Sequence, residues 1–214
     1  PEHIATRLDV RTSVEVGRLE LGQGLTVLAG GHPVAHGSAV ILTPPAPQLL
    51  GLLQASELRL ESEVAEGLKA VEYNLSLTVM VTLDAPSGLP RGHIAQPSAD
   101  VAWMADNQHK GTSEIPAVTI HSTAHFARDH FDDDPQAWRQ RLVAQVEPHL
   151  AGGVVAGTTH RWRYAEPQTT FDVGAITING PTPVVLAGEV FAGAKVEGAF
   201  LSGLAAAEAV LDRL

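Results

Sequence analysis

The chain contains no cysteine. This absence excludes disulfide bonds, zinc sites with cysteine ligands, thiol redox chemistry and cysteine nucleophiles. The sequence also has no apolar run of the length needed to cross a bilayer, and its first residues lack the pattern of a signal peptide. We therefore expect a cytoplasmic protein that has no membrane partner.

Basic residues are also scarce. The sequence has 14 Lys and Arg against 24 Asp and Glu, which gives a net charge of −10, and the basic residues do not cluster. A protein that binds nucleic acid needs a basic surface, so we expect no such partner. With 214 residues, of which 44% are hydrophobic, the chain can form one large domain or two small ones. The expected partner is a small molecule.

The usual motifs of hydrolytic and metal chemistry have little support. No serine lies in a GxSxG elbow, and Ser202 falls inside a predicted helix. His121, His125 and His130 lie close to three aspartates, and His-x3-His on a helix is a zinc-ligand spacing. However, the residues before His125 read as a strand leaving a sheet, and no glutamate stands beside His121 as a base. We predict no metal site and a solvated acidic loop before residue 135.

Alternating and helical patterns predict a mixed α/β protein. Glycines separate three short alternating stretches near the start, and a continuous apolar run ends at Pro44. Trp138, Leu142 and Val146 have helical spacing after Pro135. The predicted strands are residues 8–16, 18–21, 25–29, 38–43, 71–83, 101–106 and 116–122, and the predicted helices are residues 46–53, 61–69 and 135–148.

The last third of the chain carries the clearest candidate for a ligand site. The apolar stretch PVVLAGEVF predicts a strand that ends at Gly188 and Glu189, and VEGAFLSGLAAAEAVLDRL predicts a helix. The free N–H groups and the dipole of a helix N-terminus favour an anionic or polar ligand. Gly188 allows the backbone to approach that ligand, and Glu189 can accept hydrogen bonds from hydroxyl groups. The same small residues also suit a helix that only packs tightly.

The segment HRWRYA is the most distinctive local signal. In a strand, His160, Trp162 and Tyr164 face one side, and two arginines face the other. The aromatic side chains could form a wall for a flat substrate. Alternatively, they fill a core while the arginines bridge to acidic residues.

The segments HRWRYAEP and LAGEVFAGAKVEGAFLSGLAAA together resemble the closing part of the renalase-like branch of the FAD-dependent amine oxidases. The stretches VILTPPAPQLLGLL and VAWMADNQHKG resemble the same family, so the similarity extends over most of the chain. That family begins with a strand, a GxGxxG loop and a helix that hold the FAD pyrophosphate. This sequence has no such element, and we expect it to be a C-terminal portion of a longer protein.

The resemblance implies an α/β (α+β) fold with two parts. Residues 1–50 and 166–214 correspond to the remaining part of an FAD-binding domain. Residues 51–165 correspond to an inserted substrate domain, with a mixed, largely antiparallel sheet flanked by helices.

The resemblance also implies which residues contact FAD and substrate. Val14 is expected beside the adenine, and Glu189 stands where the family usually has aspartate. The implied cofactor-binding residues are Val14, Thr43, Pro44, Gly188, Glu189, Val196, Glu197 and Gly198. The implied substrate-binding residues are Asn107, Trp162 and Tyr164.

By resemblance, the reaction is hydride transfer from a dihydronicotinamide or an amine to the flavin, which oxygen then reoxidises. No candidate general base stands out in the sequence, and the catalytic residues stay unassigned. Because the phosphate loop is missing, we expect the isolated chain to be free of FAD and to be inactive. The alternative is a degenerate, non-enzymatic domain that binds a small ligand or a protein. An incomplete domain would expose apolar sheet surface, so a homo-oligomer is also plausible.

Overall fold

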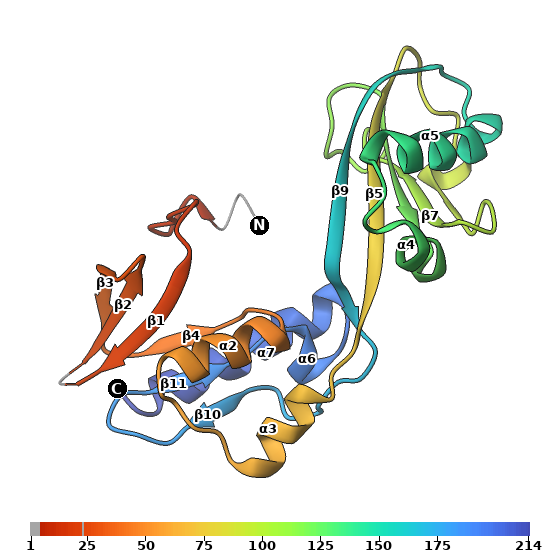
Figure 1. Cartoon of the computed structure of the whole chain (residues 1–214). Helices are drawn as coiled ribbons and strands as arrows, with labels where there is room; N and C mark the ends of the chain where they lie inside the picture. Colours follow the sequence, from red (N-terminus) through yellow and green to blue (C-terminus); the bar gives the residue numbers. More distant parts are fainter. Residues whose placement is uncertain (1–4, 23) are drawn as a thin grey trace. The chain divides into compact units, whose positions relative to one another are not determined.

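The computed structural model describes residues 5–22 and 24–214, and these divide into two compact units (Figure 1). Unit 1 comprises Pro1–Glu72 and Pro167–Leu214, and unit 2 comprises Tyr73–Glu166. The sequence prediction began the inserted part at residue 51, whereas the unit boundary lies after Glu72. The two helices between these positions, α2 (Ala46–Ala55) and α3 (Ser62–Lys69), therefore belong to unit 1.

The first sheet of unit 1 is a meander of β1 (Val16–Leu21), β2 (Leu25–Ala29) and β3 (His32–Gly37). The strand β2 pairs with β1 on one side and with β3 on the other, and both pairs are antiparallel. Gly30 and Gly31 form the turn between β2 and β3, and both have positive φ. The predicted strand over residues 8–16 is wrong, because β1 begins at Val16. Ser13, with φ of 59°, interrupts extended backbone there, and the side chains of Leu8 and Val10 are exposed.

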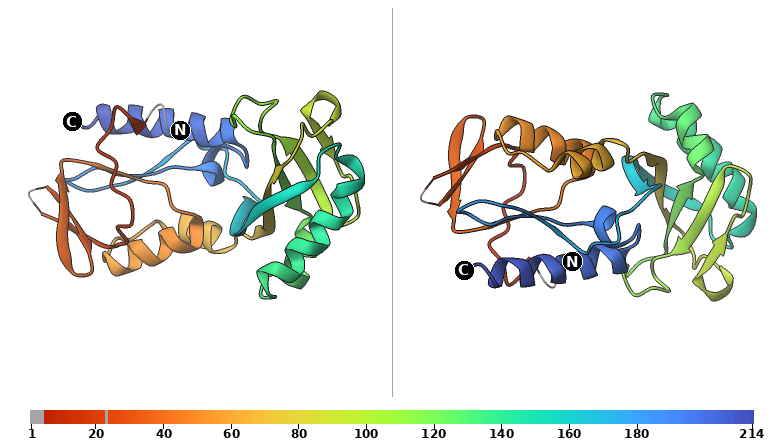
Figure 2. Two further views of the ribbon diagram at one scale, coloured as in Figure 1. Left: turned by 90° about the horizontal axis from the view of Figure 1, so that it is seen from above. Right: turned by 90° about the horizontal axis from the view of Figure 1, so that it is seen from below.

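The second sheet of unit 1 contains β10 (Ile176–Ile178), β11 (Val184–Leu186) and β4 (Val40–Leu42), in that order. β11 is antiparallel to β10 and parallel to β4. Figure 2 shows α7 (Val196–Leu211) on one side of this sheet and α2 on the other. The short helix α6 (Glu189–Ala192) follows β11. Because helices cover both faces, the residues of β11 are all buried.

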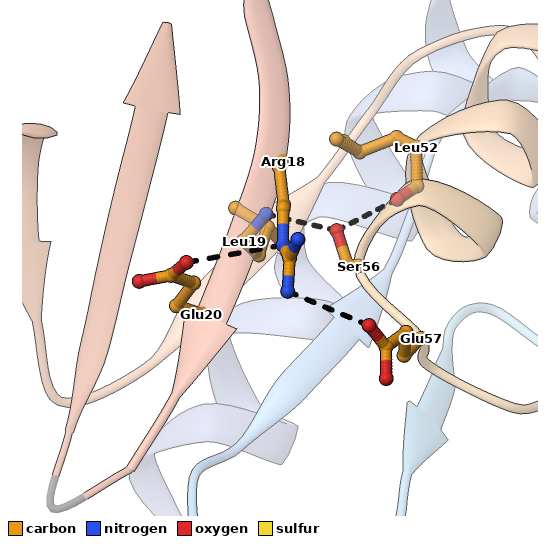
Figure 3. Close-up of polar contacts among 6 residues, drawn as sticks. All are labelled: Arg18, Leu19, Glu20, Leu52, Ser56 and Glu57. Atoms are coloured by element: carbon orange, nitrogen blue, oxygen red, sulfur yellow. Dashed lines mark hydrogen bonds and ion pairs between the residues drawn. The ribbon is translucent and has the colours of Figure 1, made fainter. Parts of the chain in front are cut away.

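A polar contact attaches the first sheet to the end of α2 (Figure 3). The backbone N–H of Leu19 donates to Oγ of Ser56 at 2.8 Å, and this hydroxyl donates to the carbonyl of Leu52 at 2.7 Å. Arg18 approaches the carboxylate of Glu57 at 3.5 Å on the exposed side. The Leu19 side chain, 1% exposed, lies under the contact, so burial and hydrogen bonding together hold β1 against α2.

Unit 2 is built on one five-stranded sheet with the order β6-β7-β8-β5-β9. The pairs β6–β7, β7–β8 and β5–β8 are antiparallel, in agreement with the predicted, largely antiparallel sheet. The strands are β5 (Tyr73–Leu83), β6 (His93–Ala95), β7 (Val101–Asp106), β8 (Ala117–Ser122) and β9 (Val154–Pro167). The helical segments are η1 (Pro90–Gly92), α4 (Ala124–His130), α5 (Pro135–Val146) and η2 (Glu147–His149).

Alternation along β5 determines which face of this sheet is covered. Leu77, Val79 and Val81 are at most 1% exposed and join the core, while the residues between them face the other side. The core is completed by α4 and α5, whose buried side chains include Trp138 and Leu142. We call the opposite face of the sheet, which these helices do not cover, the open face.

The prediction missed one helix of unit 2. The segment expected to be a strand end and a loop contains α4. Its signal was Thr123, whose Oγ1 accepts from the backbone N–H of Phe126 as an N-cap. In the described part of the chain, no helix combines the length and the apolar character that a membrane span requires.

Candidate functional site

The two parallel strands of unit 1 end side by side. The backbone N–H of Ala187, after β11, donates to the carbonyl of Leu42 in β4 at 2.9 Å. The next residues are therefore neighbours, and a Cβ placed on Gly188 would lie 3.9 Å from the carbonyl oxygen of Thr43. Carboxyl ends of parallel strands are the usual ligand sites of α/β sheets. The structure thus brings together two predicted pairs, Thr43 with Pro44 and Gly188 with Glu189.

The conformation of Gly188 explains why glycine stands there. Its φ of 137° lies in a region that other residues rarely adopt. Its N–H donates to Oγ of Ser202 at 2.9 Å, and that hydroxyl donates to the carbonyl of Gly174 at 2.6 Å. Ser202 is completely buried in α7, so this helix fixes the turn after β11. Half-buried Glu189 then opens α6.

The start of α7 is open and lacks a side-chain cap. Its N-cap is Lys195, and the backbone N–H of Ala199 makes the first hydrogen bond back to that residue. The N–H groups of Val196, Glu197 and Gly198 therefore have no partner within the helix. Val196 is 89% exposed, so core side chains do not cover this end.

Gly198 permits an unusually close backbone approach. A Cβ at this position would lie 2.1 Å from the carbonyl oxygen of Gly193, which is inside van der Waals contact. Gly193 itself has φ of 125°. The two glycines therefore hold the beginning of α7 against the end of α6, next to the turn at Gly188.

Seven of the eight predicted cofactor residues lie at these two neighbouring places, the strand ends and the start of α7. Val14 is the exception, since it precedes β1 in a segment without regular structure and is 39% exposed. A pocket of about 460 Å³ lies between α2 and α3, and none of the eight residues lines it.

These features suit the polar, hydroxyl-bearing part and the ring system of FAD. Gly188 leaves space for backbone approach, the amides of α7 offer donors, and Glu189 offers an acceptor. The sequence has no GxGxxG loop for the pyrophosphate. The residues present therefore fit one portion of the cofactor.

In unit 2, two of the three predicted substrate residues, Asn107 and Trp162, lie on the open face. Arg161 and Arg163 lie over the rings of Trp138 and Phe131, on the side of α4 and α5. Alternation then places His160 and Trp162 on the open face, whereas the ring of Tyr164 packs edge-on against that of Tyr73, with centroids 5.2 Å apart. Arg161 donates to the carbonyls of Phe131 at 2.6 Å and Asp133 at 2.5 Å, so its partners are backbone oxygens and not acidic side chains.

Asn107 reaches the same face from the end of β7. Its Nδ2 donates to Oγ1 of Thr119 on β8 at 2.9 Å, and its backbone N–H donates to Ala117. Asp106 fixes this turn by accepting from the backbone N–H groups of Gln108 and His109 at 2.8 and 2.9 Å. Burial alone would raise the pKa of Asp106, but the hydrogen bonds from Ser87, His109 and Gln108 and the charge of His109 lower it.

The sequence reasoning missed a row of aromatic and imidazole side chains on the open face. Trp103 on β7 and Thr78 on β5 both pair in register with His121 on β8. Oγ1 of Thr78 and Nδ1 of His121 are 3.0 Å apart, and Trp103 stacks on His93 at 4.6 Å. The alternating pattern of the strands that pair with β8 was the sequence signal that could have predicted this row of side chains.

Trp103 and Trp162 expose 37% and 48% of their surfaces, and the ring of Trp162 lies 4.3 Å from that of His160. Burial first, and the charge of Lys110 second, lower the pKa of His121 below its ordinary value of 6.5. The imidazole is therefore neutral at pH 7. The open face offers flat rings and neutral hydrogen-bonding groups, which suit an aromatic or heterocyclic substrate.

The histidines considered as metal ligands are on different elements. His121 lies on β8, whereas His125 and His130 lie on α4 and approach Asp129 at 3.6 Å and Asp133 at 2.7 Å, respectively. Among the described residues, no group of three or more His, Cys, Asp or Glu could hold a metal ion.

Comparison with known proteins identifies the family. Residues 1–211 match the family described as flavin containing amine oxidoreductase, so the chain belongs to that family. It is similar to the renalase of Mus musculus, with 28% identity over 177 residues, which cover 77% of this chain and 52% of the renalase. The chain thus spans about half the length of the curated relative it matches.

Solved structures share the fold. A putrescine oxidase with redesigned cofactor binding has a TM-score of 0.63 at 15% identity, covering 94% of this chain and 49% of its own. The cyclohexylamine oxidase from Brevibacterium oxydans IH-35A has a TM-score of 0.62 at 13% identity, covering 92% and 48%, respectively. The α/β fold predicted from the sequence is therefore confirmed, and these two oxidases share it.

Proposed function

We propose that this chain is part of an FAD-dependent oxidoreductase that takes a hydride from a dihydronicotinamide-type or amine substrate. The observation that carries the proposal is the grouping of Thr43, Pro44, Gly188 and Glu189 at two parallel strand ends in a member of a flavin family. FAD, when bound, supplies the hydride acceptor, which oxygen reoxidises.

In this proposal the chain contributes positioning and electrostatics. The amides of Val196, Glu197 and Gly198 stabilise negative charge that develops on the ring system, and Glu189 accepts hydrogen bonds from the ribityl chain. Trp162, on the open face, and Tyr164 orient a flat substrate, and Asn107 recognises a carboxamide. A dihydropyridine already carries a transferable hydride, so it needs little acid–base help. That requirement matches the absence of an evident general base in the sequence.

We further propose that the isolated 214-residue chain holds no stoichiometric FAD. Its sequence lacks a pyrophosphate-binding loop, and phosphate contacts at a glycine-rich turn are a major part of dinucleotide binding. The visible absorption spectrum of the purified chain tests this directly. A flavin band at a one-to-one ratio would contradict it.

The proposed reaction is tested with the protein encoded by the complete reading frame, expressed in the presence of FAD. Under anaerobic conditions, isomeric dihydronicotinamides are expected to bleach the flavin, and admission of oxygen is expected to restore the colour with one hydrogen peroxide per turnover. Benzylamine is tested in the same assay as a representative amine substrate. A protein that binds FAD but is reduced by neither substrate class would overturn the proposed reaction.

A second candidate is a non-enzymatic domain that binds a small ligand or a protein partner. The observation in its favour is that the chain spans about half of the relative's length. If the complete reading frame has no nucleotide-binding unit and takes up no FAD, this second candidate replaces the first.

A further inference from the structure

Thr78 is a buried hydroxyl residue within the row of aromatic and imidazole side chains on the open face. It is only 3% exposed, and its Oγ1 lies 3.0 Å from Nδ1 of His121 on the neighbouring strand β8. The two residues pair in register, so the sheet itself holds the hydroxyl against this ring nitrogen. Among the described residues, His121 is the only hydrogen-bonding partner of the Thr78 side chain.

The burial of Thr78 decides which of the two groups donates. A hydroxyl that is shielded from water needs an acceptor for its proton, because an unsatisfied buried donor costs stability. Nδ1 can accept only when it carries no proton, and the proton of the neutral imidazole is then on Nε2. If Nδ1 donated instead, the hydroxyl proton of Thr78 would have no acceptor in the described part of the chain. The contact therefore favours the tautomer of His121 that is protonated on Nε2.

The surroundings of His121 keep the imidazole ring uncharged. Burial and the charge of Lys110 both disfavour the protonated cation. Nε2 of His121 makes no hydrogen bond to any residue that the structure describes, and Trp103 pairs with His121 in register on β7. The open face therefore carries a neutral N–H donor beside an exposed aromatic ring.

We propose that Thr78 is a positioning residue that holds the proton of His121 on Nε2, and that it thereby selects substrates with a hydrogen-bond acceptor. The carbonyl oxygen of a carboxamide is such an acceptor, whereas an alkylammonium group has only donors. Asn107 donates through Nδ2 to Thr119, two residues before His121 on β8, and its side-chain oxygen can accept from a carboxamide N–H. The inference rests on the proposed function, and of its two substrate classes it favours the dihydronicotinamide.

The tautomer is measured on the 214-residue chain itself, without flavin or substrate. Long-range proton–nitrogen correlation NMR of the histidine-labelled chain gives the shifts of both ring nitrogens, and the signal that His121→Gln removes belongs to His121. We expect Nδ1 to have the shift of an unprotonated nitrogen and Nε2 that of a protonated one.

Thr78→Val keeps the shape of the side chain but removes the hydroxyl. It should allow the second tautomer of His121 to form, so the two nitrogen shifts move toward each other, and Thr78→Ser should restore them. The matched control is Thr82→Val, the same substitution on the same side of β5, opposite Ala117 and not His121. This control should leave the shifts of His121 unchanged. The inference is overturned if His121 of the wild type carries its proton on Nδ1, or if Thr78→Val has the wild-type shifts.

Selection of the substrate is measured with the protein from the complete reading frame, expressed in the presence of FAD. Thr78→Val should slow flavin reduction by dihydronicotinamides about two- to tenfold, the range expected for the loss of one hydrogen bond. Reduction by benzylamine should slow much less, and Thr78→Ser should recover both rates. Equal slowing with the two substrates would overturn the selective role of Thr78. If the NMR results are as expected but neither substrate reduces the flavin, the position of the His121 proton is upheld and only the proposed hydride transfer fails.

Discussion

Two glycines of α7 show how the nearest neighbouring atoms decide which substitutions a position can accept. Gly198 and Gly203 lie in the same helix, only five positions apart, yet their surroundings differ. A Cβ on Gly198 would collide with the backbone of Gly193, while a Cβ on Gly203 would meet nothing within 4 Å. The sequence shows both as small residues in a small-residue helix, and only the structure separates a required glycine from a dispensable one.

We predict opposite effects of alanine at these two positions. Gly198→Ala should destabilise the protein by about 1–3 kcal/mol or more, because backbone must move to admit the methyl group. Gly203→Ala should stabilise it by about 0.5–1 kcal/mol, because alanine restricts the unfolded chain and favours the helix. Urea unfolding of the two variants and the wild type measures both effects. Equal effects of the two substitutions would contradict the assigned close approach.

His121 gives the second prediction at this scale, through its lowered pKa. In the folded state it stays neutral below pH 6.5, where an unfolded histidine takes up a proton. Its contribution to stability is therefore fully present above pH 6.5 and is lost as the pH falls through the lowered pKa. His121→Gln should flatten the dependence of unfolding free energy on pH between 5 and 7.

At the scale of elements, the contact between β11, α6 and α7 depends on one buried hydroxyl. Ser202 satisfies both the N–H of Gly188 and the carbonyl of Gly174. Ser202→Ala leaves two partly buried backbone groups without this partner, which should cost about 1–3 kcal/mol. Hydrogen exchange at the Gly188 amide should quicken more than exchange in β5 of unit 2.

Ser113→Ala is the matched control, because the hydroxyl of Ser113 donates to Ile115 in an exposed turn. We expect its effect on stability to stay within about 0.5 kcal/mol. If Ser202→Ala were equally mild, the buried hydroxyl would not be what holds the turn after β11.

Much of the element pattern could be predicted from the sequence, and the exceptions have physical causes. Strong periodicity marked β5 and α5, with Trp138, Leu142 and Val146 buried as the spacing required. The strand expected over residues 8–16 failed because its alternation has no partner strand and Ser13 interrupts it. The helix α4 was missed because it is only seven residues long and runs into the acidic stretch 132–134, which reads as a loop.

The candidate site divides in the same way. Gly188 and Glu189 follow a strong apolar run, so their place at a strand end could be read from the sequence. The open-face row of Trp103, His121 and Thr78 depends on strand register, which is a long-range property. No local pattern in the sequence contains that register.

At the scale of the whole molecule, the two units differ in how complete they are. The large core cluster, from Leu77 to Val146, lies entirely within unit 2 and includes both of its helices. Unit 1 has an exposed apolar side on its last helix, α7. Independent folding requires a core that the unit itself can close, so the two units should differ in stability when separated.

We therefore predict that residues 73–166, which contain a complete core cluster, fold alone. The excised unit should unfold cooperatively in urea, and Leu142→Ala should destabilise it by about 2–5 kcal/mol, because the leucine is completely buried. Val155→Ala, at an exposed position of β9, is the control and should change its stability little. Heteronuclear NMR of the excised unit decides the outcome: dispersed amide signals support a self-sufficient core, and a collapsed spectrum would show that unit 2 also depends on the remainder of the protein.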